Sequence, residues 1–243
     1  VIAMLVQMLI YGIAVLYIAT TVSALCIYIS IQVEQSRKFS QEELELEKSR
    51  TAIMLSQIHP HFLYNSLSVI KGLCQTDPRQ AELAVDHFSG FLRGNLDSLT
   101  AGSPIPFSQE LSHTRHYLEL EQMRFGHRLN VIYDTPVTDF LIPPLTLQPI
   151  VENAVRHGIV KREEGGTLTV ATALTSDAYT VTVTDDGVGF DPSGPLQDGK
   201  KHIGIQNVRK RLQAQCSASL TIRSVRGCGT TAMITLPRKA GEK

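Results

Sequence analysis

The first 33 residues of the chain contain no charged side chain. A helix of that length would span about 50 Å, more than the roughly 30 Å of hydrocarbon in a bilayer. The segment 1–33 therefore predicts a transmembrane helix. A signal peptide fits poorly, because the apolar run is too long and no basic segment precedes it. The first basic residues, Arg37 and Lys38, follow at once, so we expect the remaining chain in the cytoplasm.

An initiator methionine is absent, because the chain begins at Val1 inside the apolar run. We expect a fragment or a processed chain with sequence upstream. The predicted span is then the single or the last transmembrane helix of a protein in the cell membrane.

Net charge and paired cysteines are lacking too. Lys+Arg and Asp+Glu both number 23, so no global basic field indicates a nucleic-acid partner. No CxxC pair occurs, which argues against a zinc site and against a disulfide framework. We expect buried free thiols at all four cysteines: Cys26, Cys74, Cys216 and Cys228.

A histidine–proline segment, Gln57–Leu67, lies within a helical pattern. Pro60 would remove one helical hydrogen bond at a cost of roughly 3 kcal/mol, which predicts a bend. Phe62 falls on the apolar stripe of this helix, whereas His59 and His61 flank the stripe and are accessible to another domain. Both histidines are either ordinary helix-flank residues or a site of chemistry.

Helices surround this segment. Residues 34–56 are charged and free of glycine and proline, which predicts a helical linker. Asp77-Pro78 ends the next helix and caps another. We expect a loop over 102–106 and a third helix from Ser108.

The apolar stripes of a two-helix hairpin cannot be buried within the hairpin alone. Pairing two hairpins into a four-helix bundle would bury them, so we predict a homodimer. The dimerisation and histidine region would cover 57–126.

From Asn130 the spacing of apolar residues changes from helical to alternating. Residues 127–243 are predicted to form an α+β domain. A helix is expected from Pro144 to His157, closed by Gly158. The strands are expected to alternate buried and exposed residues. They lie at 131–133, 167–173, 179–184, 218–224 and 230–236.

Polar groups and glycines gather around these strands. Asn153, Arg156 and His157 share one helical face, which is either a ligand site or a solvated surface. Asp185-x-Gly187-x-Gly189 follows a strand and allows a ligand to approach the backbone, although a plain turn has the same composition.

A loop without apolar period, 191–201, precedes a helix that opens at Gly204, a potential anion site. Gly227-Cys-Gly229-Thr230 is another turn that would let a ligand approach the backbone. No GxxxxGK[ST] phosphate loop and no Rossmann fingerprint occur. The order of the glycine segments is specific, and it predicts a two-layer α+β arrangement with ligand groups on one side.

These segments resemble the boxes of the sensor histidine kinases. Leu147–Gly158 is similar to their N-box, Asp185–Gly189 to the first glycine box, and Gly204–Leu212 to the second. Gln57–Asn65 and Tyr117–Phe125 resemble the LytS/YehU-like subgroup. The resemblance covers about 56–237 and implies a Bergerat-type (GHKL) ATP-binding domain.

The resemblance implies a role for each matching residue. His61 would be the phosphoacceptor, and Asn153 would ligate Mg²⁺. Arg156 and His157 would contact phosphate, and Asp185 would accept a hydrogen bond from the adenine amino group. The remaining nucleotide-binding residues would be Gly187, Gly189, Gly204 and Thr230, with 188–203 as a lid.

Three departures from the family pattern stand out. Phe62 follows His61, where many histidine kinases carry an acid, so no general base can be named. His202 replaces a glycine that is often seen in the second box, which predicts a stiffer lid. Pro149 lies where related ATPases carry a glutamate, which argues against efficient ATP hydrolysis.

The leading hypothesis is a membrane-bound sensor histidine kinase that uses Mg-ATP to phosphorylate His61 and passes the phosphoryl group to an aspartate of a cytoplasmic response regulator. A catalytically weak dimer that docks a regulator is the second hypothesis. A plain ATPase or serine kinase of the same domain superfamily is the third.

Overall fold

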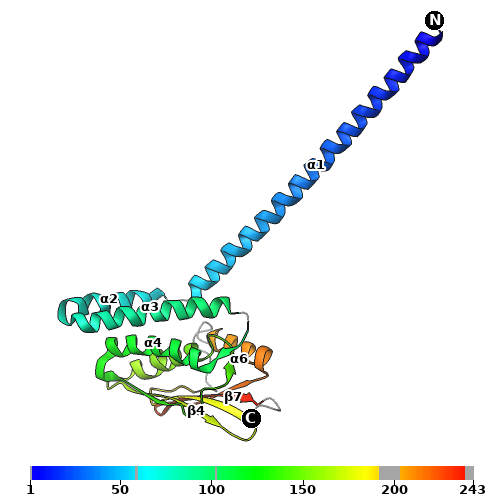
Figure 1. Ribbon diagram of the computed structural model, residues 1–243. Coiled ribbons are helices and arrows are strands. Elements are labelled where there is room, and N and C mark those ends of the chain that lie inside the picture. Colours follow the sequence, from blue (N-terminus) through cyan, green and yellow to red (C-terminus); the bar gives the residue numbers. More distant parts are fainter. Residues whose placement is uncertain (1, 58–59, 102, 192–202, 239–243) are drawn as a thin grey trace. The chain divides into compact units, whose positions relative to one another are not determined.

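The computed structural model describes residues 2–57, 60–101, 103–191 and 203–238 (Figure 1). The chain divides into two units, Val1–Gln57 and Ile58–Lys243, each described here by itself. The first unit is one helix, α1 (Ile2–Gln57), which includes the predicted linker. Its segment Ile10–Gln41 has a mean hydropathy of 2.0, is not buried, and is long and apolar enough to cross a membrane.

Two threonines within this apolar segment satisfy their hydroxyls on the helix itself. Thr20 and Thr21 donate to the carbonyls of Tyr17 and Ile18, each at 2.9 Å. Hydrocarbon offers no hydrogen-bond partners. The two polar side chains are therefore compatible with a membrane-spanning helix.

The second unit begins with a helical hairpin, α2 (Pro60–Thr76) and α3 (Pro78–Thr100), whose helices lie side by side in Figure 1. The carboxylate of Asp77 accepts the backbone N–H groups of Arg79 and Gln80 at 3.2 Å. The predicted helix break and its cap are confirmed at this position.

α1 ends at Gln57 and α2 begins at Pro60, on either side of residues 58–59, which lie outside the described residues. The helix predicted to run through Pro60, with its bend and its cost of roughly 3 kcal/mol, therefore stays a prediction. His59 lies outside the described residues.

Helix α4 (Phe107–Phe125) lies between the hairpin and the rest of the second unit (Figure 1). It packs on α3 and α2 and contacts α5 and β2, described below. The predicted loop at 102–106 is partly wrong, since β1 (Ile105–Pro106) pairs with β3 (Leu141–Ile142). Burial of Ile105 against Ile142 explains the pairing.

A five-stranded sheet has the order β2-β4-β5-β7-β6. β4, β5, β7 and β6 pair antiparallel in that order and bury alternate residues, as predicted. β2 pairs with β4 in parallel, a pairing that the sequence did not indicate. The strands are β2 (Leu129–Asp134), β4 (Gly166–Leu174), β5 (Ala178–Asp185), β6 (Ser219–Val225) and β7 (Gly229–Pro237).

Several short helices pack against this sheet. A 3₁₀ turn, η1 (Gly126–Arg128), joins α4 to β2. Next come α5 (Leu147–Asn153), the π-helical turn η2 (Ala154–Gly158) and the 3₁₀ turn η3 (Ile159–Lys161). α6 (Ile203–Cys216) packs on β6 and α5.

Both ends of the helix predicted over 144–157 are corrected. The helix begins at Leu147, because Leu145 has a positive φ of 55° that a helix does not allow. Gly158 does not close it, because η3 continues the chain to Lys161.

One hydrophobic core extends through the second unit, from Phe62 in the hairpin to Leu236 in the sheet. On the hairpin, several large apolar side chains remain exposed in the single chain: Tyr64, Leu67, Leu83, Val85 and Leu96. The dimeric four-helix bundle remains a prediction, as does the division at 57–126 and 127–243.

The cysteines are free, as predicted, but they are not buried. Cys26, Cys74 and Cys228 are exposed, and Cys216 is half-buried. Cys228 lies in the turn between β6 and β7, and Cys74 lies on an exposed part of α2. Cys26 lies in the unburied apolar segment of α1.

Candidate functional site

His61 is exposed in the first turn of α2, and its neighbour Phe62 holds that turn in place. Phe62 is only 7% exposed, and its ring centroid lies 4.5 Å from that of Phe91 and 5.0 Å from that of Tyr117. A charged side chain at position 62 would be buried in this aromatic cluster. The structure thus explains why no acid follows His61.

Asn65 orients the imidazole of His61. Its Nδ2 lies 3.0 Å from Nδ1 of the ring, one helical turn away. Because the amide can present either its nitrogen or its oxygen, it can hold either tautomer of the ring. Asn65 therefore positions His61 without fixing which ring nitrogen is protonated.

The wall behind His61 is formed by two buried polar residues of α4. Tyr117 is 2% exposed and Glu121 is 3% exposed. Neither the Tyr117 hydroxyl nor Oε2 of Glu121 has a hydrogen-bond partner among the described residues. The other carboxylate oxygen of Glu121 lies 3.6 Å from Nη1 of Arg124. Unsatisfied buried polar atoms are rare in proteins and call for an explanation.

Burial governs the ionisation of this pair. Burial raises the pKa of the Glu121 carboxyl, while the nearby Arg124 guanidinium opposes the shift and the Glu152 carboxylate adds to it. Burial, followed by the charges of Glu121 and Glu152, raises the pKa of Tyr117 well above its ordinary value. Tyr117 is therefore a hydrogen-bond donor at neutral pH.

The facing wall comes from the segment predicted to carry Asn153, Arg156 and His157 on one helical face. Arg156 and His157 lie in the π-helical turn η2 and are both exposed, while Asn153 ends α5 and is half-buried. π-helical turns are uncommon and occur frequently at functional sites. The prediction that these three residues share one face of an α-helix is therefore inexact, because Arg156 and His157 follow π-helical geometry.

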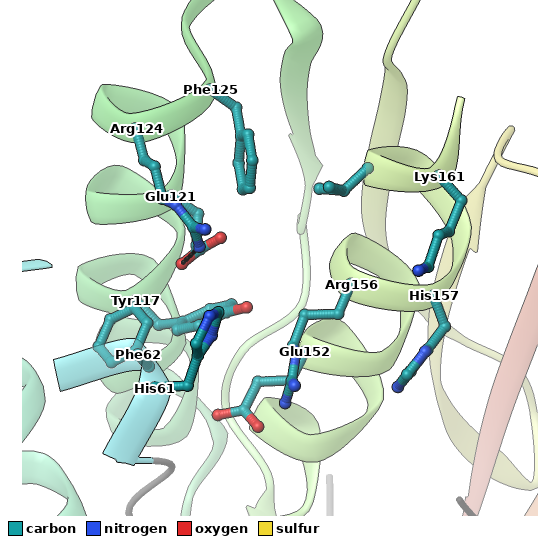
Figure 2. A pocket seen from close by; sticks show the side chains of 11 residues that line it. His61, Phe62, Tyr117, Glu121, Arg124, Phe125, Glu152, Arg156, His157 and Lys161 are labelled. Atoms are coloured by element: carbon teal, nitrogen blue, oxygen red, sulfur yellow. Dashed lines mark ion pairs between the residues drawn. The ribbon is translucent and has the colours of Figure 1, made fainter. Parts of the chain in front are cut away.

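His61 and these two walls line one pocket of about 200 Å³. Figure 2 shows the side chains around it. Glu152 and Arg156 extend into it from the wall opposite His61 (Figure 2). Cationic groups, which favour phosphate, and two carboxylates face the same space. The lining residues are His61, Phe62, Tyr117, Glu121, Arg124, Phe125, Glu152, Arg156, His157, Val160 and Lys161.

A second group of predicted residues surrounds Asp185 at the end of β5. Asp185 is 3% exposed and accepts the Gly187 N–H at 3.0 Å. Burial raises the pKa of Asp185 to about 6, although hydrogen bonds from Gly187 and Thr230 oppose the shift. The ionised form of Asp185 is therefore disfavoured in the fold. Groups with such raised pKa values often belong to ligand sites.

Gly158, where η2 ends, packs directly on this group. A Cβ at Gly187 would lie 2.2 Å from the carbonyl carbon of Gly158, and a Cβ at Gly158 would lie 2.4 Å from Oδ1 of Asp185. Gly189 has φ 57°, and a Cβ there would lie 2.1 Å from the Val225 carbonyl oxygen. The first glycine box thus needs glycine for close backbone packing. It also places the Asp185 group at the end of the turn that carries Arg156 and His157.

The remaining predicted residues lie around the same edge of the sheet. Thr230 pairs with Asp185 in the sheet register, and its hydroxyl lies 2.9 Å from that of Ser224. Gly204 is exposed in the first turn of α6, with open space around it. The predicted lid is described only as far as Asp191, and His202 lies outside the described residues.

A carboxylate that the sequence did not reveal sets the position of α5. Glu110, in the first turn of α4, is 1% exposed and accepts the backbone N–H groups of Leu145, Thr146 and Leu147 at 2.7–3.0 Å. It therefore caps the start of α5, where the helix dipole favours a negative charge. Burial raises the pKa of Glu110, and these backbone hydrogen bonds oppose that shift.

Arg211 joins α6 to the same point. Its guanidinium donates to the carbonyl of Leu145. Burial lowers the pKa of Arg211, and the charge of Glu110 opposes that shift. Arg211 therefore holds the start of α5 from the side of α6. Glu110 and Arg211 lie 101 positions apart in sequence, so their shared role leaves no local signal.

Comparison with known proteins gives two family matches. Residues 49–129 match the histidine kinase family, and residues 144–240 match the family of histidine kinase-, DNA gyrase B- and HSP90-like ATPases. The first contains His61 and the carboxylates of α4, and the second contains Asn153 and Asp185. The two walls of the pocket thus come from different family segments.

Individual relatives agree with these matches. The chain is 36% identical over 186 residues to YwpD of Bacillus subtilis, covering 74% of this chain and 67% of that protein. It is 34% identical over 202 residues to the sensor histidine kinase YpdA of Escherichia coli, covering 80% of this chain and 35% of YpdA. It is 32% identical over 179 residues to the sensor protein LytS of Oceanobacillus iheyensis, covering 69% of this chain and 30% of LytS.

The chain thus spans about a third of the length of the sensor proteins YpdA and LytS. The predicted family and the predicted class of enzyme, a protein histidine kinase, are confirmed by both family matches and by these relatives. The chain therefore belongs to the histidine kinase family, with a GHKL-type ATP-binding domain and LytS among its relatives.

Proposed function

We propose that this protein is a membrane-bound, homodimeric sensor kinase that phosphorylates its own His61 from Mg-ATP. It then passes the phosphoryl group to an aspartate of a response regulator in the cytoplasm. The observation that supports this proposal is the shared pocket: His61 faces Arg156 and His157, which lie on the turn that leads to the Asp185 group.

The chemistry of the pocket suits phosphoryl transfer. This reaction depends mainly on positioning the donor and acceptor and on offsetting the charge of the phosphate oxygens. Arg124, Arg156 and Lys161 supply positive charge beside the His61 ring. A neutral imidazole, the ordinary state above about pH 6.5, can attack phosphorus through a ring nitrogen.

Asn153 suits a magnesium ligand. Its Nδ2 donates to the Pro149 carbonyl at 2.8 Å, which directs the amide oxygen to other partners. Among the residues that the structure describes, no group of three His, Cys, Asp or Glu could hold a metal. Mg²⁺ commonly binds through one or two protein ligands together with substrate phosphates, so a single Asn fits. Bound Mg²⁺ would offset phosphate charge.

We assign the adenine-binding end of the proposed nucleotide site to Asp185. We infer that its carboxylate accepts the amino group of adenine, with Gly187, Gly189, Gly204 and Thr230 around the nucleotide. The close packing of Gly187 and Gly189 on the neighbouring backbone, together with the hydrogen bond from the Gly187 N–H, holds the Asp185 carboxylate in position. Pro149, in place of an acid that could activate water, favours transfer to His61 over hydrolysis.

Labelling with γ-³²P-ATP tests the proposal in the full chain in detergent micelles. We expect label on the parent chain that is lost in acid and survives base, and no label on His61→Gln. His127→Gln is the matched control, because His127 is an exposed histidine outside the pocket, and it should label normally.

Equal labelling of His61→Gln and the parent would disprove the assignment and make His59 the next candidate. Acid-stable label would favour a serine kinase or an ATPase of the same superfamily. A parent chain that binds no ATP analogue would instead be a regulator-docking module.

A further inference from the structure

The pocket beside His61 contains a buried carboxylate oxygen with nothing to bind. Oε2 of Glu121 has no hydrogen-bond partner among the described residues, although the side chain is 3% exposed and lines the pocket. The Tyr117 hydroxyl, one turn earlier on α4, is in the same state. Two unsatisfied groups on one wall indicate an interaction that forms only when the site is at work.

Phosphorylation of a histidine produces a proton that must be accepted. One ring nitrogen forms a bond to the γ-phosphorus, and the bond from that phosphorus to the bridging oxygen breaks. The nucleoside diphosphate leaves with the electron pair. The other ring nitrogen then carries a proton on a cationic ring. Transfer of this proton to a base leaves the imidazole ring of the phosphohistidine uncharged.

Most neighbours of His61 cannot accept that proton. Phe62, which occupies the position of the usual acid, has no acceptor atom, and the amide of Asn65 can only orient the ring. Tyr117 is protonated at neutral pH because burial raises its pKa. Arg124, Arg156 and Lys161 are cations. His157 also lines the pocket, but its ring is expected to contact phosphate, so the carboxylates of Glu121 and Glu152 remain.

The two carboxylates differ in what they already bind. Oε1 of Glu152 accepts a hydrogen bond from Nε2 of Gln148 at 2.9 Å. Glu121 has a buried oxygen that accepts no hydrogen bond from a described group. The packing of Tyr117 of α4 on Phe62 holds this part of the helix in place. Glu121 is therefore the better candidate.

We propose that Glu121 accepts the imidazole proton of His61 during phosphorylation. The proposal rests on the proposed function, because it assigns a residue within that reaction. It places the base on α4, in the pocket that the phosphoacceptor also lines and 60 positions away in sequence. The proton later leaves to solvent through the open side of the pocket.

The ionisation of Glu121 agrees with this role. Burial and the Glu152 carboxylate raise its pKa, which makes it a stronger base than an exposed glutamate, and Arg124 limits the shift. The charged and titratable groups that face Glu121 across the pocket, in addition to Tyr117 and Arg124 on its own helix, are His61, Glu152, Arg156, His157 and Lys161.

Initial rates of autophosphorylation in the full chain in detergent micelles test the proposal. Glu121→Gln should lower the maximal rate about 100-fold, in the range for loss of a general base, while the KM for ATP stays within about twofold. Glu121→Asp should recover part of the rate, because it keeps a carboxylate. Glu119→Gln, on the same helix and outside the pocket, should react at the parent rate.

The pH profile separates a proton acceptor from a structural role. The parent rate should fall as pH drops through the pKa of Glu121, and the residual rate of Glu121→Gln should lose that limb of the profile. A Gln variant within threefold of the parent rate, or an Asp variant no faster than Gln, would overturn the assignment. If Glu121→Gln does not fold, Glu121→Ala takes its place, and an Ala variant within threefold of the parent rate overturns the assignment.

These outcomes are distinct from failure of the proposed function. A His61→Gln chain that still labels removes the function and the assignment together. An unlabelled His61→Gln beside a fully active Glu121→Gln removes only the role of Glu121. A loss that follows Glu152→Gln instead would identify Glu152 as the acceptor.

Discussion

Glu110, in the first turn of α4, and Glu121, near its end, lie on the same buried face of one helix. Eleven residues make about three helical turns, so both point away from solvent. Glu110 accepts three backbone N–H groups, whereas Oε2 of Glu121 accepts none from the described residues.

This difference distinguishes a carboxylate with a structural role from one that is available for another interaction, within one helix. A carboxylate whose oxygens are all occupied holds other elements in place, as Glu110 holds the start of α5. A buried carboxylate with an unused oxygen costs stability and is retained for another reason. Helix α4 thus fixes the start of α5 at one end and lines the pocket of His61 at the other.

The largest expected effect comes from Glu110→Ala. Three buried backbone N–H groups would lose their acceptor at about 1–3 kcal/mol each, partly relieved by water, so we expect a loss of roughly 4 kcal/mol. Glu121→Ala should change stability by less than about 1 kcal/mol, because it breaks no satisfied buried hydrogen bond. Denaturant unfolding of the full chain in micelles, followed by circular dichroism, measures both.

Glu110→Gln sharpens the test, because it keeps one acceptor oxygen and should lose about half as much. Its ATP-analogue affinity should fall with stability, since α5 carries Asn153. Equal losses of stability for the changes at 110 and 121 would show that the two carboxylates have the same role.

Asp185 is a third buried carboxylate, and its ionisation should affect nucleotide binding. Its pKa of about 6 lies above the ordinary 3.8, so its contribution to folding is present below about pH 4 and lost as pH rises through 6. Nucleotide binding should have the opposite dependence, because the ionised form is the better acceptor for the adenine amino group. Between pH 7.5 and 5 we expect up to about tenfold weaker binding.

Calorimetric titration with a non-hydrolysable ATP analogue at a series of pH values measures this effect. Asp185→Asn should bind more weakly at pH 7.5 and should lose the pH dependence between 5 and 7.5. A parent chain whose affinity is flat over this range would show that Asp185 does not bind the ligand as a carboxylate.

Local signals in the sequence account for the elements that were predicted correctly. The Asp77 cap, the alternation of β4 to β7 and the glycines beside Asp185 each follow from neighbouring residues and backbone sterics. Glu110, Glu121 and Arg211 gave no such signal, because a polar residue on a helix normally indicates a solvated face. The parallel pairing of β2 with β4 and the π-helical turn η2 are likewise set by tertiary packing.

The face of α4 that packs on α3 provides the smallest and most specific comparison. A Cβ at Gly94 would lie 2.6 Å from Cγ and 3.1 Å from Cβ of His113, and this Cβ is fixed to the backbone of α4. A Cβ at Gly90 would meet only the outer ring atoms of His116, and one at Gly72 would meet nothing within 4 Å.

Alanine gains about 1 kcal/mol over glycine in a helix interior, so Gly72→Ala should stabilise by about that amount. Gly90→Ala should be close to neutral, because rotation of the His116 ring offsets the gain. Gly94→Ala should destabilise by about 1 kcal/mol, since overpacking exceeds the gain in propensity. Gly94→Ala also shifts α4 while every pocket side chain is retained. If it slows autophosphorylation as much as Glu121→Gln does, and Glu121→Asp is no faster than Glu121→Gln, the rate depends on the position of α4 and not on the carboxylate.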